Sequence, residues 1–181
     1  MKYTYFDSPI GPLLLAGAGT KLQVLGFPTG RMALREQAGW QRDTSAFADV
    51  RKQLAEYFAG TRRDFELELA PQGTPFQLAV WRQLRTIPFG QTCSYGDIAR
   101  ALAKPLAVRA VGAANGRNPL PIIVPCHRVI GADGSLTGFG GGLPTKEFLL
   151  GLEGVALRGP TARKPAQAKG AGQRTLFAAE I

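Results

Sequence analysis

The sequence contains few residues that could bind a metal or form disulfide bonds. Its 181 residues include two cysteines, Cys93 and Cys126, and one histidine, His127. Two cysteines cannot build the framework of bridges that stabilises small secreted domains. A structural zinc site normally takes four Cys or His ligands, which is more than this chain contains. The sequence therefore predicts a protein without a disulfide framework, a metal or a cofactor.

The sequence also lacks the long apolar segments of membrane and secreted proteins. No apolar run approaches the roughly 20 residues that cross a bilayer, and Met1–Tyr5 has no apolar stretch of the kind found in a secretory signal. A hydrophobic fraction of 45% is enough to bury a core. We expect a soluble, cytoplasmic protein that is a monomer.

Basic residues outnumber acidic residues, and the excess is uneven. The formal net charge is +9, with 9 basic and 8 acidic residues in 1–72, 8 and 4 in 73–154, and 5 and 1 in 155–181. A basic C-terminal part fits a polyanionic partner, because Lys and Arg displace counterions from a phosphate backbone. A solvated basic surface would have the same composition, so charge alone leaves both interpretations open.

The pattern along the chain predicts an α+β fold with two domains and a tail. Residues 1–70 should form an antiparallel sheet with one helix. Its strands are expected at 3–6, 13–16, 22–27 and 65–69, and its helix at 46–59. Residues 73–155 should form a mostly helical domain. Residues 156–181 have no apolar period and predict a flexible basic tail.

Helix-capping signals mark the second domain. Thr74–Gln77 and Ser94–Asp97 have the spacing of capping boxes, which begin helices. Helices are expected from 75 to about 87, over 95–103, over 107–115 and over 146–152, the last one capped by Thr145, together with a buried strand at 122–124.

The helices at 95–103 and 107–115 have the arrangement of a helix-turn-helix, in which the second helix enters a groove of DNA. This second helix carries mostly small side chains, and Arg109 is its only long charged residue. Small residues let a helix lie close to another surface, which can be DNA or the protein's own interior. The pattern leaves both open.

Cys126 and His127 are neighbours at the end of an apolar run. A thiolate is the reactive form of cysteine, and a nearby histidine can accept the thiol proton. Such a base is usually oriented by a third group, for which Glu153 on the last helix is a candidate. For an isolated Cys-His pair, an inert buried cysteine is the more common interpretation. Cys93 has no such neighbour and is interpreted as structural.

The segment Ile122–Ile130 resembles the active-site signature of the O6-alkylguanine-DNA alkyltransferases, also called methylated-DNA–protein-cysteine methyltransferases. Further segments fall in the order and spacing of that family: Thr74–Gly90, Ser94–Gly96, Arg109–Ala113, Asn118-Pro119 and Lys146–Leu150 with Glu153. The resemblance covers about residues 73–154 strongly and 1–69 loosely. It implies a ribonuclease-H-like N-terminal domain followed by a DNA-binding domain with a helix-turn-helix.

The resemblance implies DNA repair by direct reversal of damage. The protein would bind double-stranded DNA that carries O6-alkylguanine, flip the damaged nucleotide out of the duplex and transfer the alkyl group to Cys126. O4-alkylthymine is a further implied substrate. The product is a thioether that no nearby group can hydrolyse, so each molecule would act once.

The resemblance also assigns roles to single residues. Cys126 would accept the alkyl group, His127 would act as its base through a bound water, and Glu153 would orient His127. Asn118 would support the active-site turn, and Tyr95 would rotate the 3′ phosphate and help to protonate the leaving guanine. Arg109 would fill the stack left by the flipped base. The other residues implied at the DNA are Gly96, Lys104, Ala110, Ala114 and Asn115. The residues implied around the base are Val129, Phe139 and Gly140.

The glycine-rich loop departs from the family pattern. Many relatives carry Tyr where Phe139 stands, and Ser, Ala or a similar residue where Gly140 stands. We expect Gly140–Gly142 to make this loop more flexible and the pocket more open, so that larger O6-alkyl groups could enter.

Gln173–Phe177 resembles the short Gln-x-x-Leu-Phe peptides with which bacterial replication proteins bind the sliding clamp. Pentapeptides of this kind also occur by chance. The resemblance implies the sliding clamp as a second partner.

Two other functions fit parts of the pattern. A DNA-binding regulator could use Cys126 as an alkylation sensor, but no second effector domain is visible in the sequence. A Cys-His hydrolase could use Cys126 and His127, but it would not need a helix that reads DNA.

Overall fold

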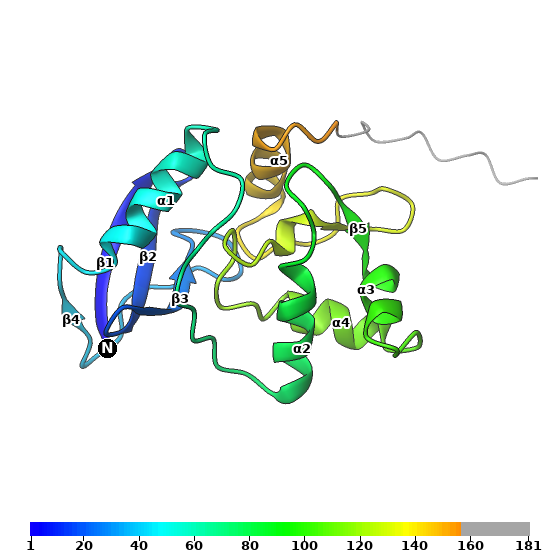
Figure 1. Cartoon of the computed structure of the whole chain (residues 1–181), viewed down its shortest axis with the longest axis horizontal. Helices are drawn as coiled ribbons and strands as arrows, with labels where there is room; N and C mark the ends of the chain where they lie inside the picture. The colour runs from blue at the N-terminus through cyan, green and yellow to red at the C-terminus, as the bar shows by residue number, and fades with distance from the viewer. Residues whose placement is uncertain (157–181) are drawn as a thin grey trace, which may run out of the picture.

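The computed structural model describes residues 1–156, so the expected tail from residue 157 and its Gln173–Phe177 motif lie outside the described residues. A sheet with one helix forms one side of the molecule, and a group of helices forms the other (Figure 1). Within residues 1–156, no helix is long and apolar enough to cross a lipid bilayer.

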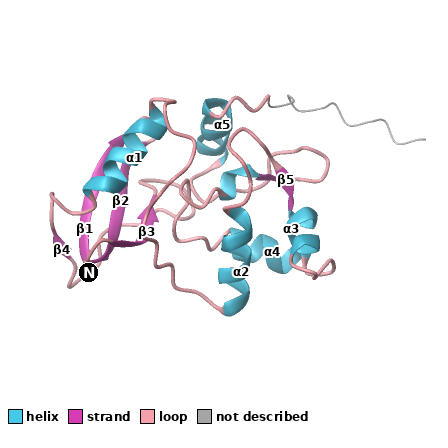
Figure 2. Cartoon of the chain, in the orientation of Figure 1, coloured by secondary structure: helices cyan, strands magenta, loops and turns pink. Residues whose placement is uncertain are grey.

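The sheet has the strand order β3-β2-β1-β4 (Figure 2). Its strands are β1 (Lys2–Ser8), β2 (Gly11–Ala18), β3 (Lys21–Gly26) and β4 (Gln41–Arg42). The first three are antiparallel, as expected, whereas β4 pairs parallel with β1. Leu13 and Leu14 are neighbours on the central strand β2, and both are fully buried. A strand buried on both faces loses the usual alternation of apolar and polar residues.

The helices lie where the sequence predicts them, with differences at their ends. They are α1 (Ala48–Phe58), α2 (Pro75–Leu84), α3 (Tyr95–Ala101), α4 (Val108–Asn115) and α5 (Leu143–Leu152). Thr74 and Ser94 cap α2 and α3 as expected. The prediction that Thr145 caps the last helix is wrong, because α5 begins at Leu143 with Pro144 in its first turn. The Thr145 hydroxyl instead donates to the carbonyl of Gly141 at 2.8 Å.

The predicted strand at 65–69 is wrong, and a side chain explains why. Leu22 and Leu69 form only an isolated bridge. The Gln53 amide on α1 binds both backbone groups of Glu66, donating to its carbonyl and accepting from its N–H at 2.9 Å each. These backbone groups are therefore satisfied without a neighbouring strand.

The predicted strand at 122–124 is also wrong. Ile122 has φ 75°, in the left-handed region, and the Val124 N–H donates to the Leu120 carbonyl at 2.8 Å. The segment is a buried turn that leads into a 3₁₀ turn, Cys126–Arg128. A short apolar run shows that a segment is buried, but its periodicity does not fix the backbone conformation.

Two short strands that the sequence does not predict hold this turn against the helix-turn-helix. They are β5 (Cys93–Ser94) and β6 (Val129–Ile130), which pair in parallel. Because β5 leads directly into α3 and β6 follows the 3₁₀ turn, the pairing brings the start of α3 close to Cys126.

Replacing the buried Leu54 on α1 by alanine should lower the free energy of unfolding by about 2–5 kcal/mol, since the change removes packing and leaves a cavity. Leu54 is 0% exposed, whereas Leu106 is 99% exposed. Leu106→Ala is therefore the matched control and should change the value by less than about 0.5 kcal/mol. Urea unfolding measures both, and equal losses would contradict this packing.

Candidate active site

Asn118 fixes the turn that presents Cys126. The Asn118 side chain is 1% exposed. Its amide nitrogen donates to the Val124 carbonyl at 2.8 Å, and its oxygen accepts from the Leu120 N–H at 3.1 Å. The Cys126 N–H then donates to the Val124 carbonyl at 2.8 Å. The predicted supporting position of Asn118 agrees with these contacts.

The Cys126 thiol lies in a buried setting that keeps it protonated. The residue is 4% exposed, and burial raises the pKa of the thiol to about 11. The Asn118 side chain and the charge of Lys146 act in the opposite direction without reversing the shift. Because the thiolate is the nucleophile, Cys126 needs a base that removes its proton.

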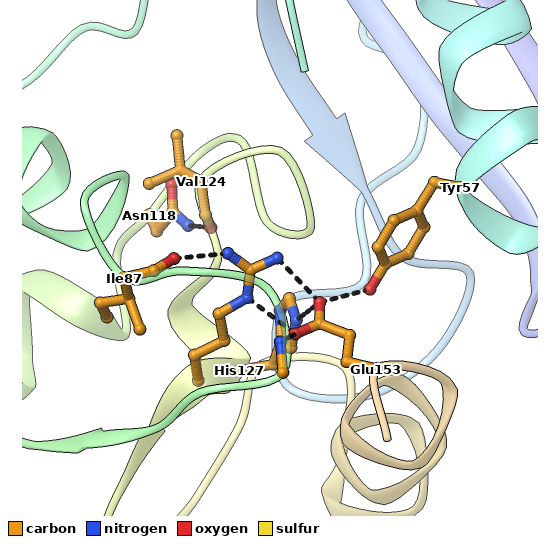
Figure 3. A network of polar contacts seen from close by, with 8 residues as sticks. Tyr57, Ile87, Asn118, Val124, His127 and Glu153 are labelled. Carbon is orange, nitrogen blue, oxygen red and sulfur yellow. Dashed lines mark hydrogen bonds and ion pairs between the residues drawn. The ribbon is translucent and has the colours of Figure 1, made fainter. Parts of the chain in front are cut away.

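His127 is placed as such a base. Its side chain is fully buried, and Nε2 lies 2.8 Å from Glu153 Oε1 (Figure 3). Burial lowers the pKa of His127 more than Glu153 raises it. A carboxylate only accepts hydrogen bonds, so the proton of the neutral ring sits on Nε2. His127 Nδ1 has no hydrogen-bond partner among the described residues and is the nitrogen that can accept a proton.

The Glu153 carboxylate is the centre of a buried polar network (Figure 3). Arg128 donates to it twice, from Nε at 2.8 Å and from Nη2 at 2.9 Å. The Tyr57 hydroxyl donates to Oε1 at 2.8 Å, and the Gly90 N–H donates to Oε2 at 3.2 Å. Burial alone would raise the pKa of Glu153, but the bonds from His127 and Arg128 outweigh it and lower the pKa to about 2. The carboxylate is therefore ionised.

Lys146 is a buried residue of the site to which the sequence assigns no role. It is 0% exposed, and Nζ donates to the carbonyls of Val129 at 2.6 Å and Thr137 at 3.3 Å. Burial lowers its pKa to about 8. A signal was available, because Lys146 precedes Leu149 and Leu150 by three and four residues and so shares their buried helix face.

Tyr95 lies at the start of α3, half-buried. Its hydroxyl shares a hydrogen bond of 2.8 Å with the Thr137 hydroxyl. Burial raises the pKa of Tyr95, so the phenol stays protonated and can act as a proton donor.

Two residues of the predicted DNA-binding set lie on the buried side of α4. Ala114 and Asn115 are 2% and 6% exposed, because this side of α4 packs against α2. The Trp81 indole on α2 donates to the Ala114 carbonyl at 2.9 Å. The opposite face of α4 is open, and it carries Arg109 and Ala110 at its exposed surface.

The remaining predicted contacts lie at or near the surface. Lys104 is exposed in the turn between α3 and α4, and Gly96 is partly exposed in the first turn of α3. Both α3 and α4 therefore present residues of the predicted DNA-binding set outward.

The glycine-rich loop is held by the N-terminal half rather than being open. The Met32 N–H donates to the Gly140 carbonyl at 3.0 Å, and the ring of Phe27 lies 5.4 Å from that of Phe139. A Cβ added at Gly140 would lie 2.5 Å from Met32 Sδ and 2.9 Å from Met32 Cβ. The space that a side chain at 140 would occupy is therefore filled by Met32. The expectation of a more open pocket does not fit this packing.

A groove of about 340 Å³ lies beside this loop. Its walls come from α4, through Gly112 and Ala113, from the loop, through Phe139, and from the N-terminal half, through Arg31 and Met32. The predicted base-binding residues Phe139 and Gly140 thus lie next to the small face of α4.

Replacing Gly140 by serine should lower the free energy of unfolding by about 1–3 kcal/mol, because the new side chain overlaps Met32. Adding Met32→Ala should recover part of the loss, since the two residues share one space. Gly138→Ser is the matched control, because a Cβ at Gly138 meets nothing within 4 Å. Additive losses in a double-mutant cycle, measured by urea unfolding, would contradict the overlap.

Replacing Glu153 by glutamine should destabilise the protein most at neutral pH. The pKa of Glu153 falls from its ordinary value of 4.5 to about 2 on folding, so the carboxylate stabilises the fold above pH 4.5. This contribution is lost as the pH falls from 4.5 through about 2. Near neutrality we expect a loss of about 3–5 kcal/mol in Glu153→Gln, because Arg128 keeps a buried charge without its partner.

The difference between the wild type and Glu153→Gln should therefore narrow in acid, as measured by urea unfolding at several pH values. Glu147→Gln changes an exposed glutamate of the same helix and is the control. A difference that stays constant from neutral pH down to about pH 2 would contradict the lowered pKa of Glu153.

Comparisons with known proteins identify the family of this chain. Residues 1–71 match the family model described as "6-O-methylguanine DNA methyltransferase, ribonuclease-like domain", and residues 75–155 match its "DNA binding domain". The methylated-DNA–protein-cysteine methyltransferase of Methanosarcina acetivorans is 51% identical over 154 residues, which is 85% of this chain and 99% of that protein. The protein of that name from Mycobacterium tuberculosis H37Rv is 52% identical over 155 residues, 83% of this chain and 91% of the relative.

Solved structures lead to the same family. A crystal structure of Mycobacterium tuberculosis OGT in complex with DNA has a TM-score of 0.80 and 51% identity, and the match covers 84% of this chain and 92% of that one. An O6-methylguanine DNA methyltransferase from Methanococcus jannaschii has a TM-score of 0.60 at 28% identity, over 89% and 99% of the two chains. The chain belongs to the 6-O-methylguanine DNA methyltransferase family.

Proposed function

We propose that this chain repairs duplex DNA by transferring the alkyl group of O6-alkylguanine to Cys126. Its relatives are named for transfer from methylated DNA to a protein cysteine. The observation that carries the assignment to Cys126 is the buried array behind it. His127 follows Cys126 directly, and Glu153 binds His127 Nε2 at 2.8 Å, which leaves Nδ1 as the base. Burial raises the pKa of Cys93 to about 11, the same as that of Cys126, so either thiol would need a base. The single histidine of the chain follows Cys126 directly.

The chemical step is a single displacement. The thiol proton passes to His127 Nδ1 through a bridging water, and the sulfur forms a bond to the alkyl carbon while the bond from that carbon to O6 breaks. The guanine anion that leaves takes a proton from the Tyr95 hydroxyl. The proton held by His127 then replaces the one that Tyr95 lost, so atoms and charges balance. The thioether at Cys126 is stable, and the protein is used once.

Helix α4 is the element that we propose to bind DNA. Its exposed face has small side chains at Ala110 and Ala113, so it can approach a groove closely. Arg109 projects from this face and would fill the space that the flipped nucleotide leaves. Lys104 and Gly96 would contact the phosphate backbone, where Lys carries no sequence information but adds affinity.

The flipped base would lie between α4 and the glycine-rich loop. A groove lined by Gly112 and Phe139, which lies between these two elements, supports this proposal. The Val129 carbonyl and the backbone amide near Gly140 would read its edge. The Val129 carbonyl already accepts from Lys146 at 2.6 Å. Because a carbonyl oxygen has two lone pairs, it could accept a second hydrogen bond, from the base. We also propose O4-alkylthymine as a substrate of the same pocket.

Further parts of the proposal concern the whole molecule. We propose two domains, over residues 1–70 and 73–155, a monomer in solution, and a cytoplasmic location.

Alkyl transfer should require Cys126 and not Cys93. Incubation with a duplex that holds O6-methylguanine, followed by mass spectrometry of the peptides, should show one methyl group on the peptide with Cys126. Cys126→Ala should abolish the transfer, and Cys93→Ala should retain it at the stoichiometry of the wild type. A wild type that binds this duplex and gains no methyl group would refute the proposed function.

Arg109→Ala should slow repair of duplex DNA about ten- to a hundredfold, because the cost of unstacking a base is a few kcal/mol and each 1.4 kcal/mol is tenfold. The reaction with a free O6-alkylguanine base should keep its rate, since nothing has to be flipped. Arg82→Ala removes an exposed arginine on α2 and is the control. Equal slowing on the duplex and the free base would contradict a role in flipping.

We propose the sliding clamp as a second partner through Gln173–Phe177. A pull-down with purified clamp should lose the protein when Leu176 and Phe177 are both replaced by alanine. Retention of the variant at the level of the wild type would contradict this proposal.

A further inference from the structure

A tyrosine from the N-terminal half reaches the polar network of the active site. Tyr57 lies on α1, 96 residues from Glu153 in the sequence, and its hydroxyl donates to Glu153 Oε1 at 2.8 Å. Both side chains are at most a few per cent exposed. Figure 3 shows the phenol pointing from α1 toward the carboxylate, on the side away from Ile87.

Aromatic neighbours hold the Tyr57 ring in this place. Its centroid lies 5.4 Å from those of Phe58 and Phe65, and 6.3 Å from that of Phe89. These rings offer no hydrogen-bond acceptor of ordinary strength. A buried hydroxyl needs a partner, and among the described residues Glu153 is the partner of the Tyr57 hydroxyl.

The Glu153 oxygen that Tyr57 binds is the one that holds His127. Oε1 accepts from His127 Nε2, from Arg128 Nη2 and from the Tyr57 hydroxyl, at 2.8, 2.9 and 2.8 Å. Oε2 accepts from Arg128 and Gly90 instead. Three donors therefore share the charge of one oxygen atom, so the loss of one donor leaves more of that charge for the other two.

The charged and titratable groups around this oxygen come from every element that packs on it. The 3₁₀ turn supplies Cys126, His127 and Arg128. Helix α5 supplies Lys146, and Glu153 itself is the C-cap of that helix. Helix α1 supplies Tyr57. Burial and the neighbouring Glu153 raise the pKa of Tyr57 far above neutrality, so Tyr57 acts as a donor throughout the range in which His127 titrates.

We infer that Tyr57 is a positioning residue that limits the charge which Glu153 presents to His127, so that the N-terminal half sets the basicity of the catalytic histidine. The inference rests on the proposed function for its consequence in repair, but the contact itself does not. Without the Tyr57 hydroxyl, Oε1 would accept more strongly from His127 Nε2. The ring would then hold a proton on Nδ1 more readily. His127 would stay protonated up to a higher pH, and a protonated ring cannot act as a base.

The single histidine of the chain makes this measurable without any reaction. The imidazole signals of His127 can be followed by NMR as the pH changes. In Tyr57→Phe the pKa of His127 should rise by about half a unit, since a hydrogen bond to the charged form of Glu153 is lost. The acidic limb of the pH–rate profile of methyl transfer should shift to higher pH by the same amount.

Tyr5→Phe is the matched control. It also removes a bond between a phenol and a glutamate, from Tyr5 to Glu36, but in an exposed part of the sheet. It should leave both the His127 titration and the pH–rate profile unchanged.

A ring-fluorinated tyrosine at position 57 tests the inference if the Tyr57→Phe variant does not fold. Its more acidic phenol is a stronger donor, so the pKa of His127 should fall rather than rise. A purely structural role of Tyr57 would change thermal stability and leave the His127 titration in place.

The outcomes separate the two proposals. If Tyr57→Phe and the fluorinated variant both titrate like the wild type, the inference is wrong, whatever the wild type does to DNA. If the wild type gains no methyl group on Cys126 while the His127 pKa moves as described, the proposed function is wrong and the coupling between Tyr57 and His127 stands.

Discussion

The buried carboxylate of Glu153 is the constraint on which the rest of the structure depends. An ionised carboxylate inside a protein is tolerated only when its charge is matched and its oxygens are hydrogen-bonded. Arg128 matches the charge with two bonds, and His127, Tyr57 and Gly90 complete the set. These residues come from α1, from the loop after α2 and from the 3₁₀ turn Cys126–Arg128. One side chain therefore binds groups from both the sheet half and the helical half.

Burial of Cys126 and His127 keeps both side chains neutral in the free protein. The pKa of the thiol is raised and that of His127 is lowered, in both cases first through burial. The resting pair is thus a neutral thiol beside a neutral imidazole. Lys146 lies close enough to favour a thiolate when one forms, while its own ammonium is held by the carbonyls of Val129 and Thr137.

Much of this arrangement could be predicted from the sequence where a local signal exists. The capping boxes at Thr74 and Ser94 fixed the starts of α2 and α3, and the family resemblance brought Cys126, His127 and Glu153 together. The errors occurred where a distant side chain decides the backbone. Gln53 satisfies Glu66 and removes a strand, and Asn118 bends an apolar run into a turn.

Several features of the site could not be predicted from the sequence, because they also depend on contacts between residues that are distant in the chain. Tyr57 is separated from Glu153 by 96 residues, and the pattern of α1 marks it only as one more apolar position. Ala114 and Asn115 were placed at the DNA by their helix, whereas the packing of α4 on α2 turns them inward. Met32 fills the space beside Gly140, which no local pattern of the glycine-rich loop indicates.

The protonation state of Cys126 in the free protein tests the central claim most directly. In a Cys93→Ala variant, the Cβ of Cys126 can be labelled with carbon-13 and its chemical shift followed by NMR as the pH rises. The account predicts a neutral thiol at neutral pH and a thiolate only in strongly alkaline solution, with a pKa near 11. A thiolate at neutral pH in the free protein would contradict it, because Cys126 would then need no proton transfer to His127.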